Sequence, residues 1–246
     1  MLTVRKFVCG AACFVAAGVF AAGTLPIGYT EIEYIQGTNA TARIVTDYVP
    51  TPNADKIEAV IEFPAGTLGS SDHTIWCARE TDVKGTWTLF VFNRNGASKF
   101  RFDYGTTKSA DLTPALGTGT KYTVTAEGNV FTCSGGQGVT MSKVADFTAG
   151  GPVTLFASYV TNTDTSKDKY GKQRLYSFKV WRSGELIHYF VPCKDPSGDV
   201  TMVDICDNPA TCPRMESSPQ VPRATTLTMR YLAVCRFCRF PTSIWM

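Results

Sequence analysis

Alternation of apolar and polar side chains, interrupted at Val60, marks the stretch Lys56-Ile57-Glu58-Ala59-Val60-Ile61-Glu62-Phe63. Every second residue from Ile57 to Phe63 is apolar and falls on one face of an extended chain, whereas Glu58 and Glu62 fall on the other. A period of two residues is that of a β-strand with one buried face. The stretch therefore predicts a half-buried strand over residues 56–63.

The next two strand patterns predict a hairpin. Residues 87–92 are rich in aromatic and β-branched side chains, and residues 99–104 alternate strictly between polar and aromatic ones. Between them lies Asn93-Arg94-Asn95-Gly96, a typical turn sequence. Two strands joined by so short a turn are expected to pair as a β-hairpin.

Short strand patterns without helical periodicity extend from about residue 30 to about residue 207. Further strands are predicted over residues 121–126, 130–133, 153–160, 174–182 and 185–191. Closely spaced strands with no helix between them are typical of two packed sheets. The predicted fold class is all-β, a two-sheet antiparallel jelly-roll sandwich.

Charge is distributed unevenly along the 246 residues. Residues 214–246 carry five Arg and one Glu, a net charge of +4, whereas residues 24–213 carry seventeen Lys and Arg against twenty Asp and Glu, a net charge of −3. A slightly acidic domain lacks the basic surface by which proteins bind nucleic acid. We therefore expect no nucleic-acid partner.

The first 23 residues have the pattern of a secretory signal peptide. Arg5 and Lys6 precede an apolar run over residues 7–20, and small residues suited to cleavage follow it. The run is shorter than the roughly 20 residues that span a bilayer. We expect residues 1–23 to be removed, leaving no stable membrane span and a protein that is secreted, at the cell surface or in a periplasm. The alternative is an uncleaved membrane anchor.

The end of the chain differs from the rest. Residues 214–246 begin with a polar segment containing proline and end in a basic, aromatic stretch without alternation. We predict a poorly ordered tail there, which leaves residues 24–213 as the folded domain.

Nine cysteines are present, and two of them lie within residues 1–23, so the mature chain would keep an odd number. We predict a disulfide between Cys206 and Cys212, which are close enough in sequence to close a short loop. Three others lie within strand-like runs, where a buried thiol acts as a small apolar side chain: Cys77, Cys133 and Cys193.

Three segments resemble, in the same order, motifs of a known superfamily. They are residues 25–35 (Leu-Pro-Ile-Gly-Tyr-Thr-Glu-Ile-Glu-Tyr-Ile), residues 100–105, and the pair formed by residues 174–181 and 186–193. They are similar to the opening, the central strand and the closing strands of bacterial and phage-associated laminin-G-like jelly rolls, which belong to the concanavalin A-like lectin/glucanase superfamily. The resemblance covers about residues 25–207 and implies a jelly roll. The final Phe-Tyr-x-Asn motif of that group is absent here.

Members of that superfamily bind glycans, adhere to proteins or hydrolyse glycosidic bonds, so the resemblance implies no single function. Our first hypothesis is an exported, non-catalytic binding or adhesion module with carbohydrate as its ligand. The alternatives are a structural surface protein with protein partners, and a divergent glycoside hydrolase.

The sequence gives no arrangement typical of an enzyme. Glycoside hydrolysis needs two carboxyl groups about 5 to 10 Å apart. Glu58 and Glu62 share a face but lie about 13 Å apart along a strand, and Glu31 and Glu33 are expected on the solvent side of an edge strand. The histidines are placed no better, because His73 is expected in a loop and His188 inside the sandwich.

Two weaker site predictions complete the sequence analysis. Trp181 alternates out of phase with residues 176, 178 and 180, so we expect its ring on an outer face, available to a sugar. Oxygen-bearing side chains at alternate positions, as in calcium loops, are Asn162, Asp164 and Asp168. The alternative for that segment is a solvated loop without an ion, and we expect no other cofactor.

Overall fold

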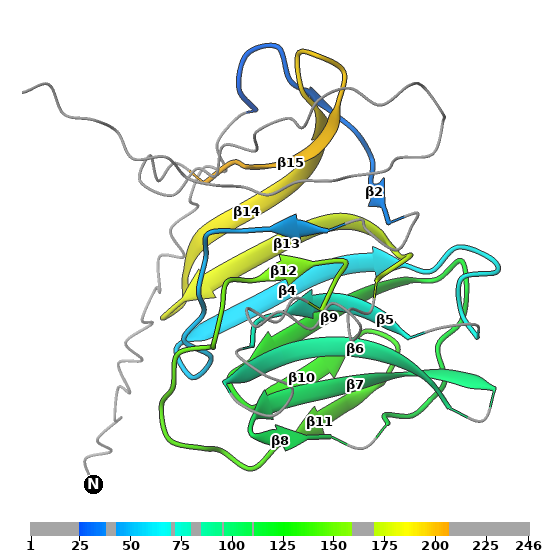
Figure 1. Cartoon of the computed structure of the whole chain (residues 1–246), viewed down its shortest axis with the longest axis vertical. Coiled ribbons are helices and arrows are strands. Elements are labelled where there is room, and N and C mark those ends of the chain that lie inside the picture. The colour runs from blue at the N-terminus through cyan, green and yellow to red at the C-terminus, as the bar shows by residue number, and fades with distance from the viewer. Residues whose placement is uncertain are drawn as a thin grey trace, which may run out of the picture.

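The computed structural model describes residues 25–37, 43–69, 72–79, 85–94, 96–109, 111–158 and 170–206. The predicted leader, calcium loop and tail, together with Cys212, lie outside these ranges. In the described ranges every regular element is a β-strand, and the strands form two antiparallel sheets packed face to face (Figure 1). The predicted fold class, an all-β jelly-roll sandwich, is confirmed. These ranges contain no helix that could span a bilayer.

One sheet has nine strands. Its path is β1 (Thr30–Glu31), β14 (Glu185–Lys194), β13 (Arg174–Arg182), β4 (Asp55–Glu62), β9 (Lys121–Glu127), β10 (Val130–Cys133) and β11 (Gly138–Thr140), with β15 (Val200–Asp204) beside β14 and β2 (Ile35–Gln36) beside β13.

The other sheet has six strands. Its order is β3 (Ile44–Val45), β12 (Thr154–Leu155), β5 (His73–Cys77), β6 (Thr86–Arg94), β7 (Ala97–Gly105) and β8 (Thr107–Lys108).

The alternating stretch that predicted the fold forms β4, a central strand paired with β13 and β9. Ile57, Ala59 and Ile61 are fully buried, whereas Glu58 and Glu62 lie on the outer side of the sheet. The predicted face of this strand is therefore the one that packs against the second sheet.

The predicted hairpin is formed by β6 and β7, which pair from Thr86 with Gly105 to Arg94 with Ala97. The strands extend further toward each other than predicted, so the connection contains residues 95 and 96 alone. A second tight connection joins β13 to β14 through Ser183 and Gly184, with φ values of 52° and 85°. Positive φ at both positions is the geometry of a type I′ turn, which matches the twist of the paired strands.

The space between the sheets is filled by aromatic and aliphatic side chains. Trp76 and Trp87 are fully buried here, so neither ring offers a surface to a ligand. Burying one large apolar side chain contributes about 1.5 to 3 kcal/mol, so the combined contribution is large. The other fully buried aromatic residues are Phe63, Phe100, Phe102, Tyr104, Phe131, Phe178 and Phe190.

Two local predictions are wrong. A strand was expected over residues 153–160, but within the described residues 153–158 it is limited to Thr154–Leu155, because Phe156 has a φ of 65° that ends the extended chain. His73 begins β5 and is buried, whereas a loop was expected. Its neighbours in sequence are polar and suggested a loop, but its ring packs 6.3 Å from that of Phe63, centroid to centroid.

A β-bulge in β13 changes the face on which Tyr176 lies. The pairing with β4 shifts between Leu175 and Ser177, so Tyr176 falls outside regular alternation. Phe178 is fully buried, but Tyr176 is half-buried and lies on the outer side. The sequence pattern had placed both on one face, which is wrong for Tyr176.

The three cysteines that were expected to pack inside strands are buried or half-buried. Cys77 and Cys193 are buried and Cys133 is half-buried, and burial raises the pKa of the Cys193 thiol to about 11. A thiol with so high a pKa stays protonated at neutral pH and packs as a small apolar side chain.

A buried carboxylate fixes one end of β4 to β13. Asp55 accepts hydrogen bonds from Arg182, through Nε at 2.8 Å and Nη2 at 3.2 Å, from the Thr51 N–H at 2.5 Å, and from the Tyr48 hydroxyl. Burial and the neighbouring carboxylate raise the pKa of Tyr48 above its ordinary value, so its hydroxyl stays a donor. The His188 ring lies 4.9 Å from that of Tyr48, tilted by 60°, and its Nδ1 is 2.6 Å from Asp204 Oδ2, which confirms it as a satisfied interior residue.

We expect Asp55→Ala to lower the free energy of unfolding by about 1 to 3 kcal/mol, because it leaves the Tyr48 hydroxyl and the Thr51 N–H without their acceptor, whereas the 44% exposed Arg182 side chain can be hydrated. Glu58→Ala is the matched control, since Glu58 lies on the same strand and pairs with Lys179 of β13 at 3.3 Å, nearer to solvent. The control should cost less than about 1 kcal/mol. Urea denaturation of both variants measures the difference, and equal losses would contradict the prediction.

His73 should make the fold sensitive to mild acid. Burial lowers its pKa, while hydrogen bonds to the carbonyl oxygens of Thr67 and Tyr170 partly oppose this. The unfolded chain therefore binds a proton below a pH of about 6.5 that the folded chain does not, and stability falls by up to about 1.4 kcal/mol per pH unit until the lowered pKa is reached. In denaturation experiments at a pH of about 7.5 and about 5.5, His73→Gln should lose less stability than the parent chain. An equal loss in both proteins would show that His73 is not responsible.

Candidate functional site

The outer side of the nine-stranded sheet holds Trp181, the aromatic residue predicted to face a ligand. Its ring is half-buried, and Lys56 Nζ lies 5.1 Å from the ring centroid. We call this surface the nine-stranded face. Its main side chains are Tyr34, Lys56, Glu58, Glu62, Lys121, Arg174, Tyr176, Lys179, Trp181 and Tyr189.

Cations on the nine-stranded face contact both aromatic rings and carboxylates. Arg174 lies over Tyr34 at 4.5 Å and contacts Glu62 at 2.9 Å. Lys179 lies 5.0 Å from the centroid of Tyr189 and 3.3 Å from Glu58. Charges on this face are therefore largely balanced locally.

The outer side of the six-stranded sheet is composed differently. The strand register places Thr154, Cys77, Thr88, Asp103 and Lys108 in one row across β12, β5, β6, β7 and β8. A second row contains Thr74, Phe90 and Arg101. Phe92 and Lys99 form a third row, and Arg79 lies beyond the end of β5. We call these residues together the six-stranded face.

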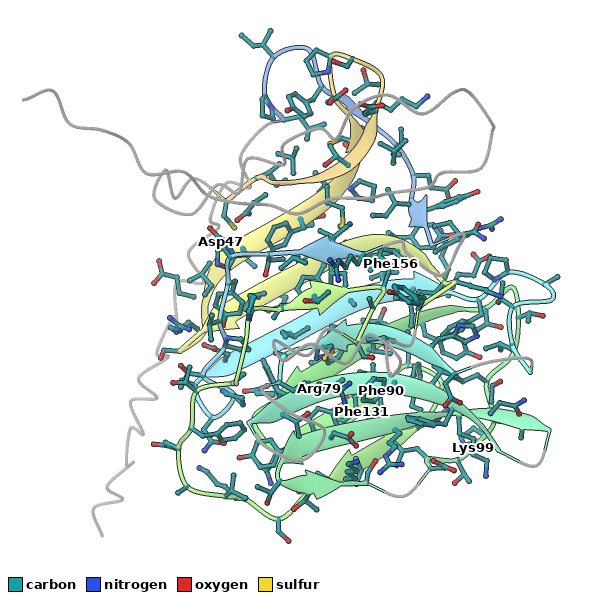
Figure 2. All side chains as sticks on the ribbon, in the orientation of Figure 1. Asp47, Arg79, Phe90, Lys99, Phe131 and Phe156 are labelled. Atoms are coloured by element: carbon teal, nitrogen blue, oxygen red, sulfur yellow. The ribbon has the colours of Figure 1, made fainter. Side chains whose placement is uncertain are left out.

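Charged and aromatic groups are in direct contact on the six-stranded face. Arg101 Nε lies 3.1 Å from Asp103 Oδ1, and its guanidinium carbon is 5.1 Å from the centroid of the Phe92 ring. The rings of Phe92 and Phe90 meet edge to face at 5.5 Å. Arg79 covers Phe90 with its guanidinium carbon 5.5 Å from the ring centroid, and Figure 2 shows the two labelled side by side.

Asp103 is the buried anion of this cluster. Burial raises the pKa of its carboxyl group, whereas Arg101, Lys108 and Arg79 all act to lower it. All three cations therefore lie close enough to interact with one carboxylate. This carboxylate orients Arg101, and the Phe92 ring limits the movement of the same guanidinium group.

Hydroxyl groups line the rest of the surface. Thr86 donates to Thr88 at 3.1 Å, and Thr88 donates to the Cys77 sulfur at 3.7 Å. Among the described residues, the buried hydroxyl oxygens of Thr74 and Thr154 have no hydrogen-bond partner.

Access to the six-stranded face is from the side of β7 and β8. Phe90, Asp103 and Arg79 are almost completely buried. In contrast, the Arg101 side chain is 22% exposed, Lys99 is half-exposed and Lys108 is exposed. A ligand that approaches here first meets the three cations of β7 and β8.

Sequence reasoning missed this site, although part of its signal was visible. The strict alternation over residues 99–104 places Lys99, Arg101 and Asp103 on one face, opposite the aromatic residues of the core. Phe90 and Phe92 gave no such signal, because β6 is apolar on both faces and alternation does not tell them apart. The predicted calcium loop lies outside the described residues, and those residues contain no group of three His, Cys, Asp or Glu arranged to hold a metal.

No protein-family model and no curated protein matches the sequence. Among solved structures, the enzymatically active domain of tailspike protein 2 from bacteriophage CBA120 is similar at 13% identity and a TM-score of 0.46, over 68% of this chain and 30% of that one. A galectin from Caenorhabditis elegans is similar at 14% identity and a TM-score of 0.33, over 61% of this chain and 96% of the galectin. Scytalido-glutamic peptidase in complex with a peptide-based transition-state analogue has 14% identity and a TM-score of 0.31, over 77% of this chain and 96% of the peptidase.

Proposed function

We propose that this protein is an exported, non-catalytic carbohydrate-binding module and that its glycan contacts the six-stranded face. The observation that carries the proposal is the contact group of Phe92, Arg101 and Asp103. Small-molecule sites combine apolar ring surface with a few polar groups held in place. Here the guanidinium group of Arg101 is partly exposed and is held between the ring of Phe92 and the carboxylate of Asp103, both of which are almost completely buried.

The fixed position of Arg101 favours binding. Its Nε is already paired with Asp103, and its guanidinium plane lies against Phe92. A side chain that is ordered before binding loses less conformational entropy when the ligand arrives. Its remaining N–H donors can form charge-assisted hydrogen bonds, which are stronger than bonds between neutral groups.

The distribution of carboxylates supports a binding function without catalysis. Along the six described strands of this sheet, Asp103 is the one acidic residue. Glycoside hydrolysis by the usual mechanism needs two carboxyl groups about 5 to 10 Å apart. Export rests on the leader predicted over residues 1–23 and stays a prediction.

A binding comparison between two arginines tests the location. We expect Arg101→Ala to weaken the binding of a glycan found by array screening by about 10-fold or more, as for loss of a hydrogen bond to a charged group. Arg174→Ala is the matched control, because Arg174 also pairs with a carboxylate and lies over an aromatic ring, but on the nine-stranded face. Isothermal titration calorimetry provides the affinities.

Three results of that comparison would contradict the proposal in different ways. Unchanged affinity in Arg101→Ala together with loss in Trp181→Ala would move the site to the nine-stranded face. No binding of any glycan by the folded chain would exclude carbohydrate as the ligand class. Turnover of a bound glycan that Asp103→Asn abolishes would make the protein a hydrolase.

A second candidate function, contact with a second copy of the chain, is favoured by the nine-stranded face. Tyr, Trp and Arg are enriched in protein interfaces, and all three occur here half-exposed. Lys179 and Glu58 already neutralise each other on this face, so two copies related by a twofold axis would meet without repulsion between these charges.

Light scattering over a range of protein concentrations tests self-association. The parent chain should show a mass that rises with concentration, and the double variant Trp181→Ala/Tyr189→Ala should remain monomeric because it lacks two ring surfaces. Retained glycan binding by this variant would separate the two surfaces. A parent chain that is monomeric at every concentration would contradict this second candidate.

A further inference from the structure

We infer that the glycan bound by the six-stranded face is acidic, with carboxylate or sulfate groups along its chain. The inference rests on the proposed function, and it names the chemical class of the ligand. It follows from the distribution of charge on this face and from how the cations there are paired.

The six-stranded face has an excess of positive charge. The side chains that define this face include four cations, Arg79, Lys99, Arg101 and Lys108, and one carboxylate, Asp103, a net charge of +3. The domain over residues 24–213 has a net charge of −3. The six-stranded face is therefore a positively charged surface on a domain that is acidic overall, and such a surface attracts anions.

Lys99 and Lys108 are the cations that a ligand would neutralise. Among the described residues, neither lysine forms an ion pair, whereas Arg101 is paired with Asp103. On the nine-stranded face, in contrast, Lys121 pairs with Glu33 at 3.3 Å and Lys179 pairs with Glu58 at the same distance. The two faces thus differ in whether their lysines form ion pairs.

The cations form a line along β7 and onto β8. Lys99 and Arg101 are two residues apart on one side of β7, about 6 to 7 Å along the strand. Asp103 continues that line, and Lys108 is its cross-strand partner on β8. A chain with repeated acidic groups can contact such a line at several points, whereas a single anion would contact one.

The ring of Phe92 holds one of these cations in place. It lies in the same row as Lys99 and against the Arg101 guanidinium group. Because Phe92 is only 6% exposed, its ring positions the guanidinium group and offers little contact surface of its own. The choice of a sugar over another polyanion therefore rests on the proposed function, and the experiment includes a polyanion that is not a sugar.

Paired glycans that differ in charge test the inference on the full chain. The probes are oligogalacturonate and its methyl ester, and chondroitin sulfate and unsulfated chondroitin. We expect binding of at least one acidic glycan about 10-fold tighter than its neutralised or less charged counterpart, with the difference reduced when NaCl is raised from about 50 mM to about 300 mM.

A double lysine variant shows whether these cations are responsible. Lys99→Gln/Lys108→Gln changes two side chains near solvent and should fold normally, and it should bind the acidic glycan about 3-fold to 25-fold more weakly. Lys121→Gln/Lys179→Gln is the matched control on the nine-stranded face and should bind as the parent chain does.

The outcomes separate this inference from the function on which it rests. Equal affinity for the acidic glycan and its neutral counterpart, or for the parent chain and Lys99→Gln/Lys108→Gln, would overturn the acidic-ligand inference and leave carbohydrate binding in place. Binding of polyglutamate as tightly as any glycan would overturn the assignment to a sugar. Absence of binding to all charged and neutral glycans would remove the proposed function itself.

Discussion

Ion pairs hold the register between β4 and β13 at both ends. Asp55 meets Arg182 on the buried side, and Glu62 meets Arg174 on the outer side. A strand of regular alternation would place Arg174 and Arg182 on the same face, since their positions differ by an even number. The bulge at Tyr176 removes this conflict by reversing the alternation within β13. A slip of one residue would break both pairs and expose the inner face of β4.

The two outer faces follow from that arrangement but differ in what they offer. On the nine-stranded face, cations cover aromatic rings and meet carboxylates, as Arg174 does with Tyr34 and Glu62. On the six-stranded face the buried carboxylate of Asp103 orients Arg101. Lys99 and Lys108 form no ion pair among the described residues. Electrostatic interaction with an incoming molecule is stronger where charges are not already paired. This difference favours the six-stranded face as the surface where binding of a ligand gains more electrostatic free energy.

The architecture could be predicted from the sequence because alternation depends on neighbouring residues in one strand. The pattern of β4 and the β6–β7 hairpin were visible for that reason. The sequence did not show that His73 faces inward or that Tyr176 faces outward, because each position depends on the pairing with another strand. The six-stranded face was missed for the same reason, since Phe92 and Arg101 are brought together by cross-strand pairing and not by spacing in the chain. Trp181 was expected on an outer face and lies on one, but whether it contacts a ligand is a matter for experiment.

Short strands at the sheet borders have a consequence for behaviour at high concentration. Within the described residues, β3 and β8 border one sheet with two residues each, and the other sheet is bordered by β11 with three residues and by β15 with five. A border strand of this length exposes few free backbone N–H and C=O groups, so a neighbouring molecule has little backbone onto which to add a strand. Such a protein can be crowded on a polymer or a surface with a low tendency to form continuous intermolecular sheets.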